Sequence, residues 1–73
     1  MFARIDKEGF VLELRERSSA VPENVSECQI GEEETEKIRR GLADGKLVAL
    51  SPILRYDGIG TGEYSINYIE RVQ

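Results

Sequence analysis

The sequence predicts a small α+β fold: a small antiparallel sheet of two β-hairpins with one helix packed across a face, in the order ββαββ. Apolar residues alternate over residues 2–15 and again over 63–72, as in half-buried strands. Between them, residues 32–44 place apolar side chains four apart, as in a helix. A chain of 73 residues has room for one core, so residues 1–73 are expected to form a single domain.

The first hairpin is expected over residues 2–15, FARIDKEGFVLELR. Its turn is the tetrad Asp6-Lys7-Glu8-Gly9, which suits a type I turn followed by a glycine in the left-handed region. Period-two alternation places two residues on one side of the first strand and three on one face of the second: Ala3 and Ile5, then Phe10, Leu12 and Leu14.

Residues 16–30 are expected to form a long loop. The alternation stops here and turn-forming residues take over, namely Ser18, Ser19, Pro22, Asn24 and Ser26. One alternative within this loop is a short extended piece over residues 21–25, which would pack Val21 and Val25 at a sheet edge. Loops of this length are often functional or mobile.

The helix is expected over residues 32–44. Acidic residues fill its first turn and basic residues lie toward its end, which complements the helix dipole at both termini. Ile38 and Leu42 form a narrow apolar stripe fit to cover one face of a sheet. Gly45 resembles a left-handed cap. Gly41 marks either a close approach to the sheet or an earlier end of the helix.

A second hairpin is expected after the helix, from a strand over residues 46–56 and a final strand over 63–72. Pro52 cannot donate to a ladder, so it marks a bulge, an edge position or a break between two short strands. In the final strand, Tyr64, Ile66 and Tyr68 share one face.

Three glycines, Gly58, Gly60 and Gly62, alternate in the connection between these strands. A phosphate-binding loop would need a helix after the last glycine, and a Walker loop would also need a lysine. The following residues have the period of a strand, so the glycines are expected to form a hairpin bend with positive φ angles. Ile59, at the tip, either folds back onto the sheet or contacts something outside the domain.

Composition argues against several classes of function. Fourteen acidic and ten basic residues give a net charge of −4, which opposes nucleic-acid binding. No run of apolar residues is long enough for a membrane span. The sequence has no histidine and one cysteine, Cys28, so we expect no metal, no cofactor and no catalytic residue. The acidic cluster Glu32–Glu34 is expected to be a solvated helix start.

Four residues are candidates for binding: Tyr56, Ile59, Tyr64 and Tyr68. Aromatic residues are enriched on binding surfaces, although tyrosines on one face of a strand are also typical of a core covered by a helix. So short a chain forms a thin core, which supplies little stability. Self-association or docking to a protein partner is therefore expected to add to the stability of the fold.

Two stretches resemble known proteins. MFARIDKEGFVLE resembles the start of short tail-associated proteins of phages and prophages of Gram-positive bacteria, which often begin with a strand, an acidic-glycine turn and a second strand. EKIRRGLADGKLV is similar to a segment of tail-fibre and baseplate accessory proteins, in which a helix ending in glycine leads into a strand. Together they cover 13 + 13 = 26 of the 73 residues, and they carry over no functional residue.

The function expected from these observations is that of a non-catalytic structural or protein-interaction module, and the resemblance implies a part in a phage or prophage tail or its assembly. The alternative is a small-ligand-binding or regulatory module that uses the 57–62 glycine hairpin as a lid. The expected location is the cytoplasm, or the virion for a phage-derived protein.

Overall fold

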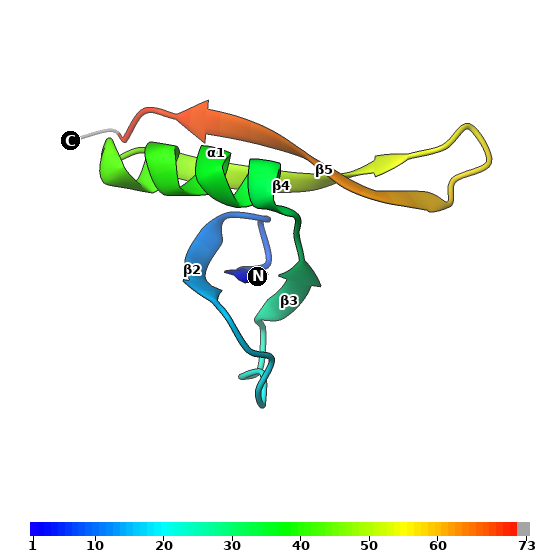
Figure 1. The fold of residues 1–73 in the computed structure, drawn as a ribbon, viewed down its shortest axis with the longest axis horizontal. Coiled ribbons are helices and arrows are strands. Elements are labelled where there is room, and N and C mark those ends of the chain that lie inside the picture. The colour runs from blue at the N-terminus through cyan, green and yellow to red at the C-terminus, as the bar shows by residue number, and fades with distance from the viewer. Residues whose placement is uncertain (72–73) are drawn as a thin grey trace.

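A computed structural model describes residues 1–71 and confirms the predicted small α+β class (Figure 1). Its elements, in chain order, are β1 (Phe2–Ile5), β2 (Val11–Arg15), β3 (Ser26–Gln29), α1 (Glu32–Ala43), β4 (Leu47–Leu54) and β5 (Gly60–Ile69). The strands form two antiparallel sheets, one of three strands in the order β2-β1-β3 and one formed by β4 and β5. The predicted final strand ended at Val72, which lies outside the described residues.

The third strand, β3, lies within the residues that were expected to be a loop. It pairs antiparallel with β1, so that Phe2 lies opposite Gln29 and Ile5 opposite Ser26. Its sequence, SECQ, lacks an apolar alternation, and its pairing partner is more than twenty residues away. The alternative extended piece over residues 21–25 is wrong: Asn24 has a positive φ of 66°, and the Val25 N–H donates to the Pro22 carbonyl in a turn.

The expected face of β2 is interrupted by a bulge. Arg4 pairs with Glu13 and Ile5 with Val11, which leaves Leu12 as an extra residue without a partner in β1. A bulge of this kind reverses the alternation on either side of it. Val11 is consequently buried and Leu12 is 54% exposed, whereas strict alternation had placed Leu12 with Phe10 and Leu14.

The turn of the first hairpin forms as predicted. The Gly9 N–H donates to the Asp6 carbonyl at 3.1 Å, and Gly9 has a φ of 90°. The Asp6 carboxylate also accepts the N–H groups of Glu8 and Phe10, so one side chain fixes the whole turn.

Local capping defines both ends of α1. At the start, the Glu34 carboxylate accepts the Gly31 N–H at 2.8 Å, which satisfies one free donor of the first turn. At the end, the N–H groups of Gly45 and Lys46 reach the carbonyls of Leu42 and Gly41, and Gly45 adopts a φ of 74°. This is the left-handed glycine cap that the sequence predicts.

Gly41 lies where α1 meets the second sheet. A Cβ atom there would lie 2.6 Å from the Tyr68 ring and 2.7 Å from the Val48 side chain. Of the two interpretations of Gly41, close approach to the sheet is therefore correct, and the helix continues to Ala43.

The two sheets meet through the first turn. The Leu50 N–H donates to the Gly9 carbonyl at 2.8 Å, and Phe10 forms an isolated bridge with Ala49 of β4. The buried apolar core that joins the sheets to α1 consists of Ala3, Val11, Ile30, Ile38, Val48 and Leu50.

The distal part of the β4–β5 hairpin extends beyond this body (Figure 1). Every residue from 51 to 63 is exposed, and we refer to this segment as the arm. The ladder is irregular inside it, between the pairs Pro52–Tyr64 and Leu54–Gly60. Pro52 itself stays paired with Tyr64 on β4, which is an edge strand of this two-stranded sheet, so the edge position is the correct meaning for Pro52. The extra residues of the irregularity, 61–63, lie in β5. Gly62 there takes a φ of 86°.

Candidate functional site

The tip of the arm is a hairpin bend, as predicted, but of the three glycines only Gly58 lies in it, because Gly60 and Gly62 belong to strand β5 and Gly60 does not take a positive φ. The Gly58 N–H donates to the Arg55 carbonyl and the Arg55 N–H to the Ile59 carbonyl, both at 2.8 Å. Gly58 has a φ of 86°, and the Asp57 carboxylate accepts the Ile59 N–H. The chain after Gly62 is strand β5, so no helix start follows the glycines and they cannot act as a helix-based phosphate loop.

Four large apolar side chains are exposed on the arm, Ile53, Leu54, Tyr56 and Ile59, and we call them the tip cluster. Tyr56 is fully exposed, whereas Leu54 and Ile59 are 57% and 56% exposed. Ile59 therefore does not fold back onto the sheet, and its second interpretation, contact with something outside the domain, remains. The binding residues predicted from the sequence did not include Ile53 and Leu54. Both come directly after Pro52, where an irregularity of the strand was expected, and this was the one signal in the sequence that could have indicated them.

The four predicted binding residues do not form one patch. Tyr56 and Ile59 belong to the tip cluster, whereas Tyr64 and Tyr68 lie in the body between β5 and α1. Tyr64 packs against the core, and the Tyr68 hydroxyl donates to the Lys37 carbonyl of α1 at 2.5 Å. The core interpretation of the tyrosines thus holds for Tyr64 only, because Tyr68 is 41% exposed although its hydroxyl reaches α1.

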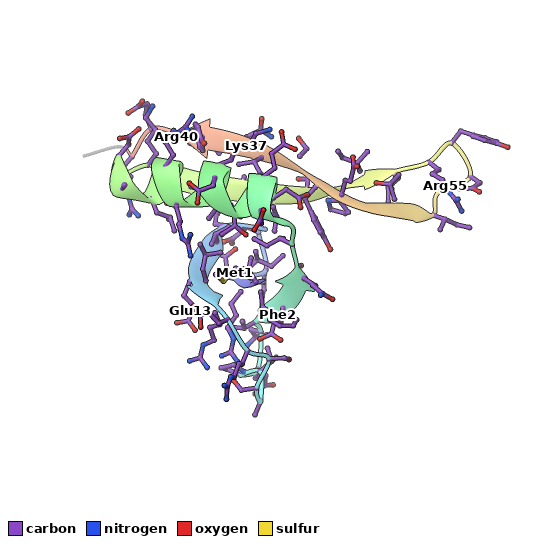
Figure 2. All side chains as sticks on the ribbon, in the orientation of Figure 1. Met1, Phe2, Glu13, Lys37, Arg40 and Arg55 are labelled. Carbon is purple, nitrogen blue, oxygen red and sulfur yellow. The ribbon has the colours of Figure 1, made fainter. Side chains whose placement is uncertain are left out.

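Charge at the tip is locally neutralised. The Arg55 guanidinium lies 3.6 Å from the Asp57 carboxylate, and Figure 2 shows Arg55 at the far end of the arm. At the irregular part of the ladder, the Thr61 hydroxyl donates to the Ile53 carbonyl and accepts the Glu63 N–H. The tip therefore presents apolar side chains on a backbone held by local hydrogen bonds.

Surface hollows occur on the body and at the base of the arm. One of about 630 Å³ lies beside the start of α1 and is lined by Met1, Ile30, Gly31, Glu32, Thr35, Glu36 and Arg39. A second, of about 340 Å³, lies between that helix end and the residues Ile53, Glu63 and Tyr64. The third, of about 240 Å³, adjoins Arg4 and Leu12. Residues 57–62 line none of these three hollows.

A buried arginine ties the 16–25 loop to the first sheet. Arg4 is 5% exposed and lies 3.2 Å from the Glu27 carboxylate. It also donates to the Ser19 hydroxyl at 2.8 Å and to the Ala20 carbonyl at 3.0 Å. A hydrogen bond from the Ser18 hydroxyl, together with Arg4, lowers the pKa of Glu27 below its usual range. All of these contacts connect parts of the chain, so we assign this cluster a role in folding.

The second group with a displaced pKa is also structural. Burial raises the pKa of Tyr64, and the neighbouring Cys28 and Glu34 add to this effect. Cys28 packs against the core, as expected for a structural thiol. In residues 1–71, no cluster of three or more potential metal-ligating side chains occurs. The single described helix is too short and too polar to cross a membrane.

Comparisons with known proteins do not indicate a function, so the candidate site is assigned from the geometry of the structure. No protein-family model matches the chain, and neither curated proteins nor solved structures provide a significant match. Four of the eight exposed large hydrophobic residues in the described part of the chain belong to the tip cluster, so it is the candidate functional site.

Proposed function

We propose that this protein is a non-catalytic interaction module that binds a protein partner through the tip of its β4–β5 arm. The observation that carries the proposal is the tip cluster: Ile53, Leu54, Tyr56 and Ile59 are exposed together on a segment that contributes nothing to the buried core. Exposed apolar side chains are common singly, but a group of them on a protruding segment favours an interface.

The shape of the arm indicates the kind of partner. Ile53 and Leu54 are consecutive residues of strand β4, so their side chains point to opposite faces of the hairpin. A narrow arm with apolar side chains on both faces fits a concave, apolar site better than a flat one. Aromatic and aliphatic anchors that fill such pockets carry most of the binding energy at protein interfaces. Because Arg55 and Asp57 neutralise each other, the tip favours a partner pocket of little net charge.

The rival function, a ligand lid formed by residues 57–62, has less support. A lid must close over a hollow, and these residues line none of the three described above. Titration with nucleotides and sugars, followed by amide chemical shifts, distinguishes the two. Localised shifts at Gly58–Gly62 would favour the lid, and unchanged shifts would favour the interaction module.

The resemblance to phage and prophage tail-associated proteins supports a partner in a tail or its assembly. The first hairpin and the α1–β4 junction carry that resemblance, and both lie in the body, away from the arm. Neighbouring capsid or tail genes would support this setting, and their absence would count against it.

Site-specific photo-crosslinking in the native host tests the proposal. A photoreactive phenylalanine analogue replaces Tyr56, and the control carries it at the exposed Arg39 of α1. We expect a discrete protein cross-linked from position 56 alone. Purified, that protein should bind the Ile53→Ser/Leu54→Ser/Tyr56→Ser/Ile59→Ser variant at least about tenfold more weakly than the wild type. Equal affinity for the variant, or cross-links that do not differ from the control, would refute it.

A further inference from the structure

Within the described residues, strand β5 has a neighbouring strand on one side only, β4. The pairing with β4 shows which N–H and carbonyl groups of β5 point toward the unpaired side. The Leu50 N–H points away from β5, because it donates to the Gly9 carbonyl. Leu50 lies opposite Ile66 in the ladder. Opposite residues either exchange both backbone hydrogen bonds or exchange none, and the Leu50 N–H is bound elsewhere, so these two exchange none. The N–H and carbonyl of Ile66 therefore point away from β4. The alternation extends this orientation to Tyr64 and Tyr68.

One of these outward groups is already satisfied within the molecule. The Tyr64 N–H donates to the Glu34 carboxylate at 2.7 Å, which agrees with the deduced orientation. Within residues 1–71, no hydrogen bond is formed by the outward N–H and carbonyl groups of Ile66 and Tyr68. Four adjacent backbone groups on β5 are therefore available to another strand.

The two edges of the second sheet differ. The Gly9–Phe10 turn covers the edge of β4 at Ala49 and Leu50, and Pro52 prevents pairing just beyond. Over residues 65–69, β5 has no proline, no charged residue and no register shift. Proteins usually protect edge strands with such features, so their absence at one edge only favours a partner strand there.

We propose that β5 pairs antiparallel with β5 of a second copy of this chain, about a two-fold axis at Asn67. This register places Ile66 of each copy opposite Tyr68 of the other, so the four free groups of each chain all find partners. Centring the axis on Ile66 instead would place Tyr68 opposite Tyr64, whose N–H is already bound by Glu34. The result is a continuous four-stranded sheet.

The helices fit this arrangement. Gly41 contacts both Val48 and Tyr68, so α1 lies above the space between β4 and β5. With strands about 4.8 Å apart, two-fold symmetry places the two helix axes about 10 Å apart, an ordinary helix-packing distance. The helices run antiparallel, which brings the acidic first turn of one near the last turn of the other, where Arg40 lies.

Disulfide trapping tests this register. Asn67 is exposed, and opposite residues of a pair without mutual hydrogen bonds have Cα atoms about 4.5 Å apart, within disulfide range. In a Cys28→Ser background, Asn67→Cys should form a covalent dimer rapidly under mild oxidation. The matched control is Ser65→Cys, because residue 65 lies opposite residue 69 of the copy and not opposite itself. Equal cross-linking of the two variants, or none, would overturn the proposal.

Charge substitution gives a second test, read by analytical ultracentrifugation. Asn67→Lys and Asn67→Asp each place like charges opposite each other, so each should weaken the dimer roughly five- to tenfold. Mixing the two variants should restore a heterodimer. A wild type that stays monomeric at all concentrations, or variants that dimerise like the wild type, would overturn the proposal. These substitutions leave the tip cluster intact, so their result is independent of the partner-binding function.

Discussion

Gly41 controls how closely α1 packs on the second sheet. The side chains of Tyr68 and Val48 occupy the space that a Cβ atom would need. Glycine usually lowers the stability of a helix interior by up to about 1 kcal/mol relative to alanine. Here the packing requirement outweighs helix propensity.

We therefore expect Gly41→Ala to destabilise the protein by about 1–3 kcal/mol, the usual cost of overpacking, despite the better helix propensity of alanine. Urea unfolding monitored by circular dichroism measures the change. Lys37→Ala on the exposed face of α1 is the control and should stay within about 0.5 kcal/mol of the wild type. A more stable Gly41→Ala would show that α1 can move away from Tyr68 at little cost.

Glu27 links stability to pH. Its pKa is lowered in the folded state, by Ser18 first and then by Arg4. A carboxylate with a lowered folded pKa stabilises the fold above its unfolded pKa, roughly 4.3 for glutamate. This contribution is lost as the pH falls through the folded value.

Acid unfolding of Glu27→Gln tests this link. From roughly pH 5 down to pH 3, the wild type should lose more unfolding free energy than the variant, which lacks the titrating group. Glu16→Gln is the matched control, because Glu16 is exposed and its side chain makes no hydrogen bond or ion pair within residues 1–71. Parallel pH profiles for the wild type and Glu27→Gln would contradict the assignment.

Sequence reasoning works at single residues when the cause is local. The roles of Gly9 and Gly45 follow from turn and cap chemistry over four or five residues, and both are confirmed. The position of Leu12 could not be predicted in this way, since the bulge depends on pairing with β1. The exposure of Ile59 depends likewise on how far the arm extends from the body.

At the scale of elements, the two hairpins have the same type of turn in different settings. In Asp6–Gly9 and in Arg55–Gly58, the N–H of a glycine with positive φ donates to the carbonyl of the first turn residue. The first turn is docked on β4, because the Gly9 carbonyl accepts the Leu50 N–H. The second lies at the end of the arm and touches nothing in the core.

Because of this difference, a glycine-to-alanine substitution should lower global stability more in the first turn than in the second. Gly9→Ala forces a Cβ into the left-handed region and should cost about 1–2 kcal/mol of global stability. A Cβ there would also lie 3.3 Å from the Leu50 carbonyl oxygen. Gly58→Ala incurs similar backbone strain, but the arm tip can fray to relieve it, so its global cost should be much smaller. Equal losses in denaturant unfolding would show that the arm and the body unfold as one unit.

The element that sequence reasoning missed is β3. The other strands carry apolar alternation or follow a capped helix, but β3 depends on contacts that are remote in sequence. Its backbone pairs with β1, and Glu27 binds Arg4. Part of the candidate site was missed for a related reason: Ile53 and Leu54 continue an apparently buried strand, and only the three-dimensional structure places them beyond the core.

At the scale of the whole molecule, the body contains the buried core and the arm contains the candidate site. All six core residues lie outside the arm, and the arm is exposed throughout. We therefore expect the body to remain folded when residues 53–63 are replaced by a short Gly-Asp-Gly turn that joins Pro52 to Tyr64.

Such a variant should retain a cooperative thermal transition and the far-ultraviolet circular dichroism of α1, while it loses partner binding. The tip-cluster serine variant, with the arm intact, is the control for a general effect of shortening. Loss of cooperative unfolding in the shortened chain would show that the arm contributes to the stability of the body.

The strands of the arm are the same two strands that pack under α1, so no separate linker joins the tip to the core. A partner that pulls on the tip along the arm loads both strands together, and the helix interface at Gly41 resists the force along with the Leu50–Gly9 hydrogen bond. Under tension, the arm can therefore transmit mechanical load directly into the folded body.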